Sequence, residues 1–322
     1  MPEIIDDKSQ HCIPFLLDRL KEHQARHGND PNAPPFFLGL NGVQGAGKTV
    51  LVSTLQKTLR SPPYSLPVVT LSLDDIYLTH ADQVALAAAH PDNPLLQHRG
   101  QPSTHDLALG EKVFASLRAK QPTAIPKYDK SAFAGQGDRV PESQWDVVNR
   151  EREEPIRVVI FEGWCVGFRP VDEATLKEKW EAAVRKKEQG GYDGRLGYVK
   201  LEDVRTINEA LKRYDVLTDQ LDALIHIDAQ NTRFVYDWRQ EQERTLRAVK
   251  GTGMTEEQVN RFVDGYYPSY ELFTETLRKG VFVPSTSTTG HESDSKDPSD
   301  WKGRQLRLVV DKNRRVQEVI LI

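Results

Sequence analysis

Residues 42–49 carry the sequence feature that most constrains how this chain folds. They read Gly-Val-Gln-Gly-Ala-Gly-Lys-Thr and match the pattern G-x-x-x-x-G-K-[ST] at every fixed position. Glycines let the backbone turn back on itself and aim successive N–H groups at one point, while a following helix adds the positive end of its dipole. The pattern therefore predicts a loop between a strand and a helix that binds the phosphate groups of a nucleotide.

Short apolar runs that alternate with helical patterns surround this loop. Residues 50–59 have the spacing of a helix directly after the glycines. Four runs are expected to be buried strands: residues 36–40, 68–73, 156–161 and 223–227. This alternation predicts an α/β fold built on a doubly wound, mainly parallel sheet.

The chain is expected to divide into an N-terminal piece and one larger domain. Residues 1–35 combine a predicted helix, over residues 13–27, with a turn-rich linker. The domain over residues 36–322 is expected to end in a β-hairpin with strands at 306–311 and 316–322.

Three segments interrupt the alternation of strands and helices. Residues 91–105 and 126–141 combine proline and glycine with charged side chains, as loops that carry function often do. We expect both to belong to an insertion at about residues 91–141. Residues 284–303 include a stretch rich in serine, threonine and aspartate, which we expect to be a mobile loop.

Composition argues against several classes of protein. The 43 Lys and Arg residues against 47 Asp and Glu residues give a net charge of −4, which disfavours a nucleic-acid partner. No apolar run approaches the roughly 18 residues that span a bilayer, so we expect no membrane partner. The acidic start lacks the pattern of a targeting signal, and the two cysteines lie far apart. We therefore expect a cytoplasmic location, with the nucleus as an alternative.

Carboxylates at two strand ends are the candidate catalytic groups. Asp74 and Asp75 follow the predicted strand 68–73, and Glu162 follows the predicted strand 156–161. Open α/β sheets bind ligands at the carboxyl ends of their strands, so we expect Asp74 to be a general base and Glu162 to hold a metal-bound water. Helix capping by the aspartates and a structural loop carboxylate at 162 are the alternatives. The sequence does not decide which aspartate is the base.

The glycine loop and a charged helix supply the expected cations. Lys48 would bridge the terminal phosphates of a nucleotide, and Thr49 would bind Mg²⁺. Residues 236–243 begin a predicted charged helix whose arginines would close over a transferring phosphate. Among them we expect Arg239 to be catalytic, and a solvated helix with an Arg239–Glu243 pair is the alternative.

These motifs resemble those of a known family. Residues 42–49, together with Ser-Leu-Asp-Asp-Ile-Tyr at 72–77, are similar to the uridine kinase, phosphoribulokinase and pantothenate kinase superfamily of P-loop kinases. The Asn-Lys-x-Asp motif of guanine-nucleotide switches does not occur. Further stretches look like the eukaryotic D-glycerate 3-kinase branch: residues 93–100, 104–106, 126–131, 137–139, 162–164, 238–239, 254–259 and 267–268.

The resemblance implies an ATP-dependent kinase that transfers the γ-phosphate to the 3-hydroxyl of D-glycerate, with Mg²⁺. It also implies a P-loop NTPase fold of the nucleotide-kinase type with acceptor-binding insertions and a helical lid, which we place at about residues 230–250. Catalytic roles fall to Lys48, Asp74, Glu162 and Arg239, and metal binding to Thr49, Asp74 and Glu162. The expected nucleotide-binding residues are Gly42, Val43, Gln44, Gly45, Ala46, Gly47, Lys48, Thr49 and Val50.

An anionic acceptor such as glycerate requires a cation for its carboxylate and polar partners for its hydroxyls. The candidates are polar residues at a strand end and in the insertion: Asp74, Tyr77, Arg99, His105, Lys127, Tyr128, Asp129 and Arg139. For each of them, a solvated or purely structural side chain is the alternative.

Two other functions fit the same residues. In the first, the acceptor is another small alcohol, such as a nucleoside or a pantothenate-like compound. In the second, the chain is an ATP-binding assembly factor that turns over no metabolite. The sequence indicates neither the oligomeric state nor the adenine contacts, nor a redox role for Cys12 or Cys165.

Overall fold

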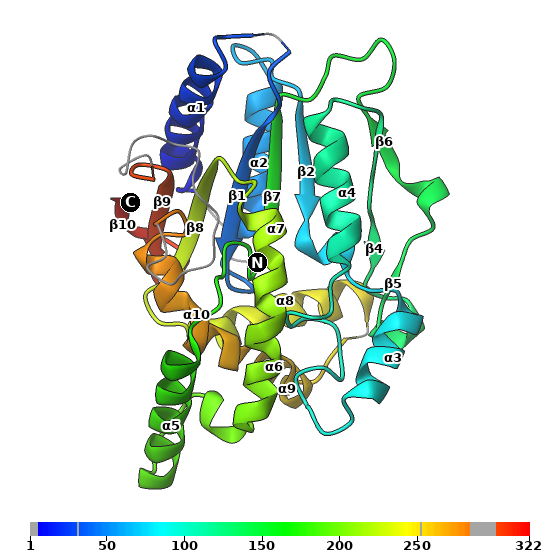
Figure 1. Ribbon diagram of the computed structural model, residues 1–322. Helices are drawn as coiled ribbons and strands as arrows, with labels where there is room; N and C mark the ends of the chain where they lie inside the picture. Colours follow the sequence, from blue (N-terminus) through cyan, green and yellow to red (C-terminus); the bar gives the residue numbers. More distant parts are fainter. Residues whose placement is uncertain (1–5, 31, 252, 284–300) are drawn as a thin grey trace.

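A six-stranded sheet forms the centre of the molecule in the computed structural model (Figure 1). The described residues are 6–30, 32–251, 253–283 and 301–322. In the order β10-β9-β8-β1-β7-β2, every neighbouring pair of strands is parallel except β9 with β10, which confirms the predicted mainly parallel α/β sheet. The strands are β1 Phe36–Gly42, β2 Val68–Ser72, β7 Val158–Gly163, β8 Ala223–Ala229, β9 Gln305–Val310 and β10 Val316–Leu321.

The four predicted buried strands are confirmed, and one of them starts later than expected. β1 is buried along its whole length, because a parallel sheet with helices on both faces exposes neither side of its inner strands. β7 begins at Val158 rather than at residue 156. Asn149 Oδ1 accepts a hydrogen bond from Ile156 N–H at 2.8 Å, so this N–H is bonded to the preceding loop and not to a neighbouring strand.

The predicted C-terminal hairpin is also confirmed. β9 and β10 pair in antiparallel fashion around the turn at residues 311–315. In addition, β9 pairs in parallel with β8, so the hairpin extends the central sheet and places its turn at the same end as the carboxyl ends of the other strands.

Helices cover both faces of the sheet. Phe36 packs against His23 of α1 with ring centres 5.7 Å apart, whereas Phe37 packs against Phe114 of α4 at 4.9 Å. Consecutive strand residues point to opposite faces, so α1 and α4 lie on opposite sides of the sheet. The α1 face also carries α2. The bounds are α1 Ser9–Arg26, α2 Lys48–Arg60, α4 Leu107–Arg118 and α7 Asp215–Thr218.

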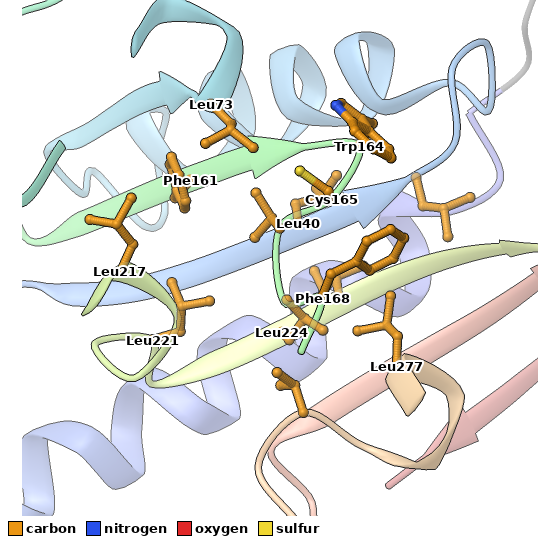
Figure 2. Close-up of a cluster of buried hydrophobic side chains, with 14 of the residues drawn as sticks. Leu40, Leu73, Phe161, Trp164, Cys165, Phe168, Leu217, Leu221, Leu224 and Leu277 are labelled. Atoms are coloured by element: carbon orange, nitrogen blue, oxygen red, sulfur yellow. The ribbon is translucent and has the colours of Figure 1, made fainter. Parts of the chain in front are cut away.

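The core on the α4 face is tightly packed next to α7. Phe161, Leu221 and Leu224 meet there (Figure 2). A Cβ atom on Gly39 would come within 2.6 Å of Leu224 and 2.7 Å of Leu221, so a larger residue at this point of β1 would force both leucine side chains to move.

The first two helices begin earlier than predicted. α2 begins at Lys48, within the glycine motif itself, and covers the helix expected over residues 50–59. α1 begins at Ser9 rather than residue 13, because Asp6 Oδ1 accepts hydrogen bonds of 3.1 Å from the N–H groups of Lys8 and Ser9. Such contacts satisfy the free N–H groups of a helix start.

A second group of helices gathers at the end of the sheet to which the β2 arrow points (Figure 1). The charged helix expected at 236–243 is α8, which extends well beyond that segment. In the described part of the chain, no helix has the length and apolar character needed to cross a membrane. The bounds of the group are α5 Glu173–Gln189, α6 Leu201–Leu211, α8 Phe234–Lys250, α9 Glu256–Asp264 and α10 Tyr267–Lys279.

The insertion predicted at about residues 91–141 is interrupted by α4, which packs on the central sheet, and short elements flank this helix. α3 (His80–Ala89) precedes residues 91–105, which form turns. Two small hairpins, β3–β6 and β4–β5, occupy the region from residue 123 onward. Their bounds, with the 3₁₀ helices, are β3 Thr123–Ile125, β4 Tyr128–Asp129, β5 Asp138–Arg139, β6 Asp146–Val148, η1 Leu73–Ile76, η2 Phe133–Gly135, η3 Glu142–Gln144, η4 Leu196–Tyr198 and η5 Lys212–Tyr214. Most of the loop expected at 284–303, residues 284–300, lies outside the described residues.

Candidate active site

The order of three strands brings the candidate catalytic segments to one edge of the sheet. β7 lies between β1 and β2, and Glu162 is in register with Leu40 of β1 and Ser72 of β2. The glycine loop 42–49 continues from β1, and Asp74 lies just beyond β2. Since the three strands are parallel, the loop, Asp74 and Glu162 share the carboxyl edge where such sheets bind ligands.

Two glycines in the loop adopt a left-handed conformation. Gly45 has φ +81° and Gly47 has φ +97°, and Gly47 is the N-cap of α2. A Cβ atom on Gly45 would lie 2.5 Å from Cβ of Trp238. Both the backbone angle and this close approach therefore require glycine at position 45. The resulting turn directs the N–H groups at the start of α2 toward the carboxyl edge.

The rest of the loop is packed into the protein. Val43 and Ala46 are buried, and the Tyr270 hydroxyl of α10 donates a hydrogen bond to Gln44 Oε1. The loop therefore gains its shape from its neighbours as well as from its own glycines.

Lys48 connects the loop with both carboxylates. Its Nζ donates a hydrogen bond of 2.8 Å to the Gly42 carbonyl. Burial lowers the pKa of Lys48, while the negative charges of Glu162 and Asp74 act in the opposite direction. Lys48 therefore lies within electrostatic range of both carboxylates at the carboxyl edge.

Asp74 lies beside cations that keep its carboxylate ionised. Its Oδ2 lies 2.5 Å from Lys130 Nζ, on the inserted segment. Burial alone would raise the pKa of Asp74, but the ion pair and hydrogen bond with Lys130, together with Lys48, hold it below its ordinary value. Asp74 is therefore ionised at neutral pH and lies between two cations.

Asp75 has a structural role instead. Its Oδ2 accepts the Ser72 N–H at 3.4 Å, and Ser72 Oγ accepts the Asp74 N–H at 3.3 Å, which makes a reciprocal cap at the start of η1. Burial, with a contribution from the charge of Asp74, raises the pKa of Asp75 to about 6. The capping alternative thus describes Asp75, and it leaves the side chain of Asp74 facing the two lysines.

The candidate Mg²⁺ ligands are oxygen groups on separate elements at the carboxyl edge. Thr49 and Val50 lie in the first turn of α2, and Glu162 lies across the edge on β7. Within the described ranges, His, Cys, Asp and Glu side chains form no group of three or more that would hold a metal ion. Mg²⁺ in kinases is typically held by one or two carboxylates, water and substrate phosphates. The oxygen groups of Thr49, Asp74 and Glu162 therefore suit Mg²⁺ without forming a closed protein site.

A buried aromatic group lies behind Asp74. The rings of Tyr77 and His105 stack with centres 4.4 Å apart, and His105 Nδ1 lies 2.6 Å from the Tyr214 hydroxyl. Burial lowers the pKa of His105 to about 3, so the imidazole is neutral. Its Nε2 is buried without a hydrogen-bond partner. This unpaired buried atom belongs to a ring within electrostatic range of Asp74.

Two arginines brace the inserted segment. The guanidinium of Arg99 donates hydrogen bonds to the carbonyls of Gly135 and Gln136. Arg139 Nη2 donates to the Tyr77 carbonyl at 2.8 Å and lies 3.0 Å from Asp106 Oδ2. Arg99 and Arg139, both predicted to bind the acceptor, therefore donate hydrogen bonds to backbone carbonyl groups. Arg139 Nε is buried and has no hydrogen-bond partner.

The other three predicted acceptor residues lie on the β4–β5 hairpin. Lys127 Nζ pairs with Asp146 at 2.8 Å, and its side chain is 43% exposed. Asp129 Oδ1 accepts the Ser131 N–H at 2.8 Å and so closes a turn. The Tyr128 ring packs edge-on against Tyr77 with centres 5.4 Å apart, which makes Tyr128 the member of this trio in contact with the aromatic group behind Asp74.

Arg239 lies on α8, where the lid is predicted. Its Nη2 is 3.2 Å from Glu243, and its guanidinium lies 5.2 Å from the centre of the Phe262 ring. Burial and the charge of Asp74 raise the pKa of Tyr266, and the charge of Arg239 lowers it. Arg239 therefore makes the ion pair within its helix and also lies within electrostatic range of Tyr266.

Neither cysteine is placed for chemistry. Cys12 and Cys165 are both free and buried. Burial raises the pKa of each thiol, so both stay protonated at neutral pH. Cys165 packs beneath the carboxyl edge, within electrostatic reach of Lys48 and Asp74.

Two residues of the site were not predicted. Lys130 lies within a stretch that resembles the kinase family, but a single exposed lysine in a loop carries no signal of its partner. Tyr266, at the junction of α9 and α10, lies close enough to Gly100 that a Cβ there would meet its hydroxyl at 2.5 Å. This contact joins the second group of helices to the insertion, and no local pattern in the sequence indicates it.

Comparisons with known proteins agree with the fold. No protein-family model matches the chain. It is 40% identical over 255 residues to the uncharacterized kinase mug58 of Schizosaccharomyces pombe, with 79% of this chain and 86% of that protein covered. It is 32% identical over 275 residues to the chloroplastic D-glycerate 3-kinase of Arabidopsis thaliana, with 83% of this chain and 54% of that protein covered.

A solved structure extends the likeness over the whole molecule. The D-glycerate 3-kinase of Cryptococcus neoformans var. grubii superimposes with a TM-score of 0.82 at 35% sequence identity, covering 99% of this chain and 100% of that one. Together with the P-loop at the carboxyl edge, these matches confirm the family resemblance seen in the sequence. This chain is a member of the eukaryotic D-glycerate 3-kinase branch of the P-loop kinase superfamily.

Proposed function

We propose that this chain is an ATP-dependent kinase that phosphorylates the 3-hydroxyl of D-glycerate. The observation that carries the proposal is the meeting of Lys48, Asp74 and Glu162 at the carboxyl ends of neighbouring strands. Relatives named D-glycerate 3-kinase, similar over most of this chain, support the choice of acceptor.

Asp74 would act as the general base. Its lowered pKa keeps it ionised, which is the state that accepts a proton. As the bond from the acceptor oxygen to the γ-phosphorus forms, the bond from that phosphorus to ADP breaks and the hydroxyl proton passes to Asp74. The products are 3-phosphoglycerate and ADP. The transferred group needs little covalent help, so positioning and charge would supply most of the rate.

Lys48 and the loop would hold the nucleotide. The residues from Gly42 to Val50 supply backbone N–H groups and the start of α2. Lys48 Nζ, which is bonded to the Gly42 carbonyl here, would turn to the terminal phosphates. Arg239 on α8 would add positive charge when the lid closes and excludes water.

Thr49, Glu162 and Asp74 are the groups that would hold Mg²⁺, directly or through water. When bound, Mg²⁺ would offset the negative charge that develops on the transferring phosphate.

Lys130 would recognise the acceptor carboxylate. In the described state its ammonium neutralises Asp74, with 57% of its side chain exposed. An arriving D-glycerate brings a carboxylate that attracts Lys130 and a hydroxyl that needs Asp74 free, so binding would exchange one ion pair for another. His105 Nε2, which lacks a partner, and Arg139 Nε would contact the hydroxyls. Tyr77 and Tyr128 would shape the pocket, while Arg99, Lys127 and Asp129 would hold its loops.

An acceptor panel tests this proposal. ATP consumption would be measured with D-glycerate, L-glycerate, glycerol, uridine and pantothenate, and the product would be identified by phosphorus NMR. We expect turnover with D-glycerate and phosphate on its 3-oxygen. Turnover only with uridine or pantothenate would show that D-glycerate is not the acceptor. Tight ATP binding without turnover of any alcohol would favour an assembly factor.

The free, buried cysteines fit a reducing compartment, and we propose that the enzyme acts in the cytoplasm or nucleus.

A further inference from the structure

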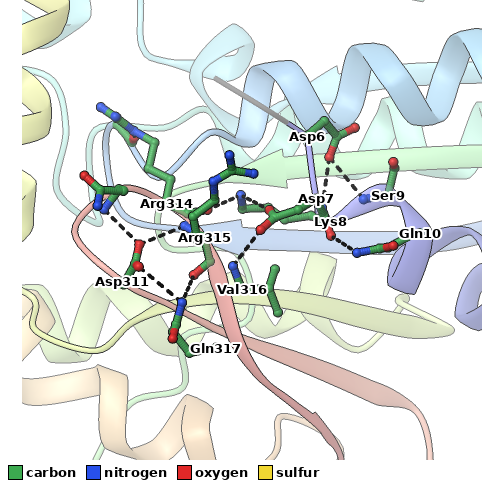
Figure 3. A network of polar contacts seen from close by, with 12 residues as sticks. Asp6, Asp7, Lys8, Ser9, Gln10, Asp311, Arg314, Arg315, Val316 and Gln317 are labelled. Atoms are coloured by element: carbon green, nitrogen blue, oxygen red, sulfur yellow. Dashed lines mark hydrogen bonds and ion pairs between the residues drawn. The ribbon is translucent and has the colours of Figure 1, made fainter. Parts of the chain in front are cut away.

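The turn of the C-terminal hairpin reaches the phosphate-binding loop. Asp311 Oδ1 accepts hydrogen bonds from the N–H groups of Asn313, at 2.8 Å, and Arg315, at 2.9 Å (Figure 3). Between them, Arg314 has φ +64°, which is uncommon for a residue with a side chain. Such a conformation persists where the surroundings fix it, and it often marks a position with a role.

The side chain of Arg314 is buried between two parts of the kinase site. Its Nε donates a hydrogen bond of 2.6 Å to the Gly45 carbonyl of the glycine loop. Its Nη2 lies 2.7 Å from Glu241 on α8, and only 8% of the side chain is exposed. Its guanidinium also lies 5.3 Å from the centre of the Trp238 ring, which packs against Gly45.

The N-terminal segment holds the turn from the other side. Lys8 Nζ, on a residue that is 2% exposed, donates a hydrogen bond of 2.6 Å to the Arg314 carbonyl (Figure 3). Asp7 Oδ2 accepts the Val316 N–H at 2.9 Å. The backbone of Arg314 is thus anchored independently of its side chain, which leaves the guanidinium fixed in position.

The contact with Gly45 sets the direction of one loop peptide. A trans peptide group is planar, so its carbonyl oxygen and the following N–H point in opposite directions. Arg314 holds the Gly45 oxygen, and the Ala46 N–H of the same peptide donates a hydrogen bond of 3.2 Å to the Val43 carbonyl. The Gly45–Ala46 peptide therefore closes a turn within the loop, and the shape of this turn sets where the other N–H groups of the loop point.

We propose that Arg314 is a positioning residue that fixes the Gly45–Ala46 peptide of the phosphate-binding loop and links it to α8 through Glu241. The inference rests on the proposed nucleotide site. Arg314 touches no reacting atom and acts through the loop, so its loss should weaken the binding of nucleotide and leave the binding of D-glycerate unchanged. Because Glu241 shares α8 with Arg239, the same contact ties the predicted lid to the loop.

The test compares Arg314→Gln with two controls from the same hairpin. Lys312→Gln removes an exposed ion pair of 2.7 Å between the same turn and Asp237 of α8. Arg307→Gln removes a 2.6 Å ion pair between β9 and Asp228 of β8, without touching the loop. For each variant, KM for ATP, KM for D-glycerate, kcat, the Kd of ADP by calorimetry and Tm would be measured.

We expect Arg314→Gln to raise the KM for ATP and the Kd of ADP by roughly tenfold, the order of effect of one hydrogen bond from a charged group. KM for D-glycerate should not change, and neither control should alter nucleotide binding. Arg314→Lys keeps a cation but loses the fork of donors, so its nucleotide affinity should fall between wild type and Arg314→Gln.

Three results separate the possible failures. An unchanged Kd of ADP in Arg314→Gln would overturn the role of Arg314, provided that Lys48→Met weakens nucleotide binding. An equal loss of affinity in Arg307→Gln would overturn it too, since stability of the hairpin would then explain the effect. Unchanged nucleotide binding in Lys48→Met would instead overturn the proposed nucleotide site. If Arg314→Gln does not fold, the same comparison applies to Arg314→Lys.

Discussion

The phosphate side and the acceptor side of the site are built by different means. The phosphate side is backbone: left-handed glycines at 45 and 47, the start of α2, and Lys48 bonded to a loop carbonyl. The proposed acceptor side consists mainly of side chains from the insertion, and one of them, Lys130, pairs with Asp74 at the end of β2. A short local motif can specify the first kind of site, whereas the second depends on how separate loops meet.

The difference also concerns rigidity. Val43 and Ala46 of the phosphate loop are buried, while Lys130 and Lys127 are 57% and 43% exposed. Exposed ion pairs contribute little to stability and exchange partners easily. We therefore expect substitutions on the phosphate side to abolish turnover, and those on the acceptor side to change specificity and KM.

The largest effect should come from Lys48→Met. Its ammonium is the charge shared by the loop and both carboxylates, so kcat should fall at least about 100-fold. Steady-state kinetics with D-glycerate would measure the loss, and circular dichroism would establish that the fold is retained. A folded variant with near-normal kcat would contradict the expectation that substitutions on the phosphate side abolish turnover.

A smaller effect should follow from Lys130→Met on the acceptor side. Loss of the cation that we assign to the substrate carboxylate should raise KM for D-glycerate by about tenfold and leave KM for ATP unchanged. Lys127→Met is the matched comparison, because Lys127 lies three residues earlier and pairs with Asp146 instead. Equal effects in the two variants would show that Lys130 has no special role.

The smallest effect concerns pH. The His105 pKa is about 3 in the folded state, against an ordinary value of 6.5. As the pH falls below about 6.5, the unfolded chain therefore binds a proton at His105 that the folded protein does not bind. Stability should therefore fall as pH drops below about 6.5, and this loss should continue toward pH 3. Between about pH 7.5 and 5.5, His105 accounts for about 1 kcal/mol, or about 3 °C in Tm.

His105→Gln removes the titrating group while keeping a polar side chain. Thermal unfolding at both pH values should show a smaller drop in the variant than in wild type. Identical drops would mean that His105 is protonated in the folded protein.

The sequence predicted the phosphate side well because its determinants are close together in the chain. The glycine loop and the helix after it lie where the motif predicts, and Asp74 lies just beyond β2, whereas Glu162 lies within β7 rather than after it. Hydrophobic runs were sufficient to find the strands, since inner strands of a parallel sheet are buried on both faces. The order of strands, which puts Glu162 between the loop and Asp74, comes only from the folded sheet.

The acceptor side and its supports were harder to predict. The distinction between Asp74 and Asp75 depends on one backbone hydrogen bond, from Ser72 to Asp75, which composition cannot reveal. Lys130 and Lys127 look alike in sequence, and only the fold gives them different partners. Arg314 contacts Gly45 across a separation of 269 residues, so no local pattern could have indicated it.

The most direct test of the central claim is turnover of D-glycerate by Asp74→Asn beside its neighbour Asp75→Asn. We expect kcat to fall at least about 100-fold in Asp74→Asn, which cannot accept the proton. Asp75→Asn keeps an oxygen for the cap and should retain kcat near that of wild type. Near-normal turnover in a folded Asp74→Asn, or an equal loss in both variants, would contradict the assignment of Asp74 as the base of this site.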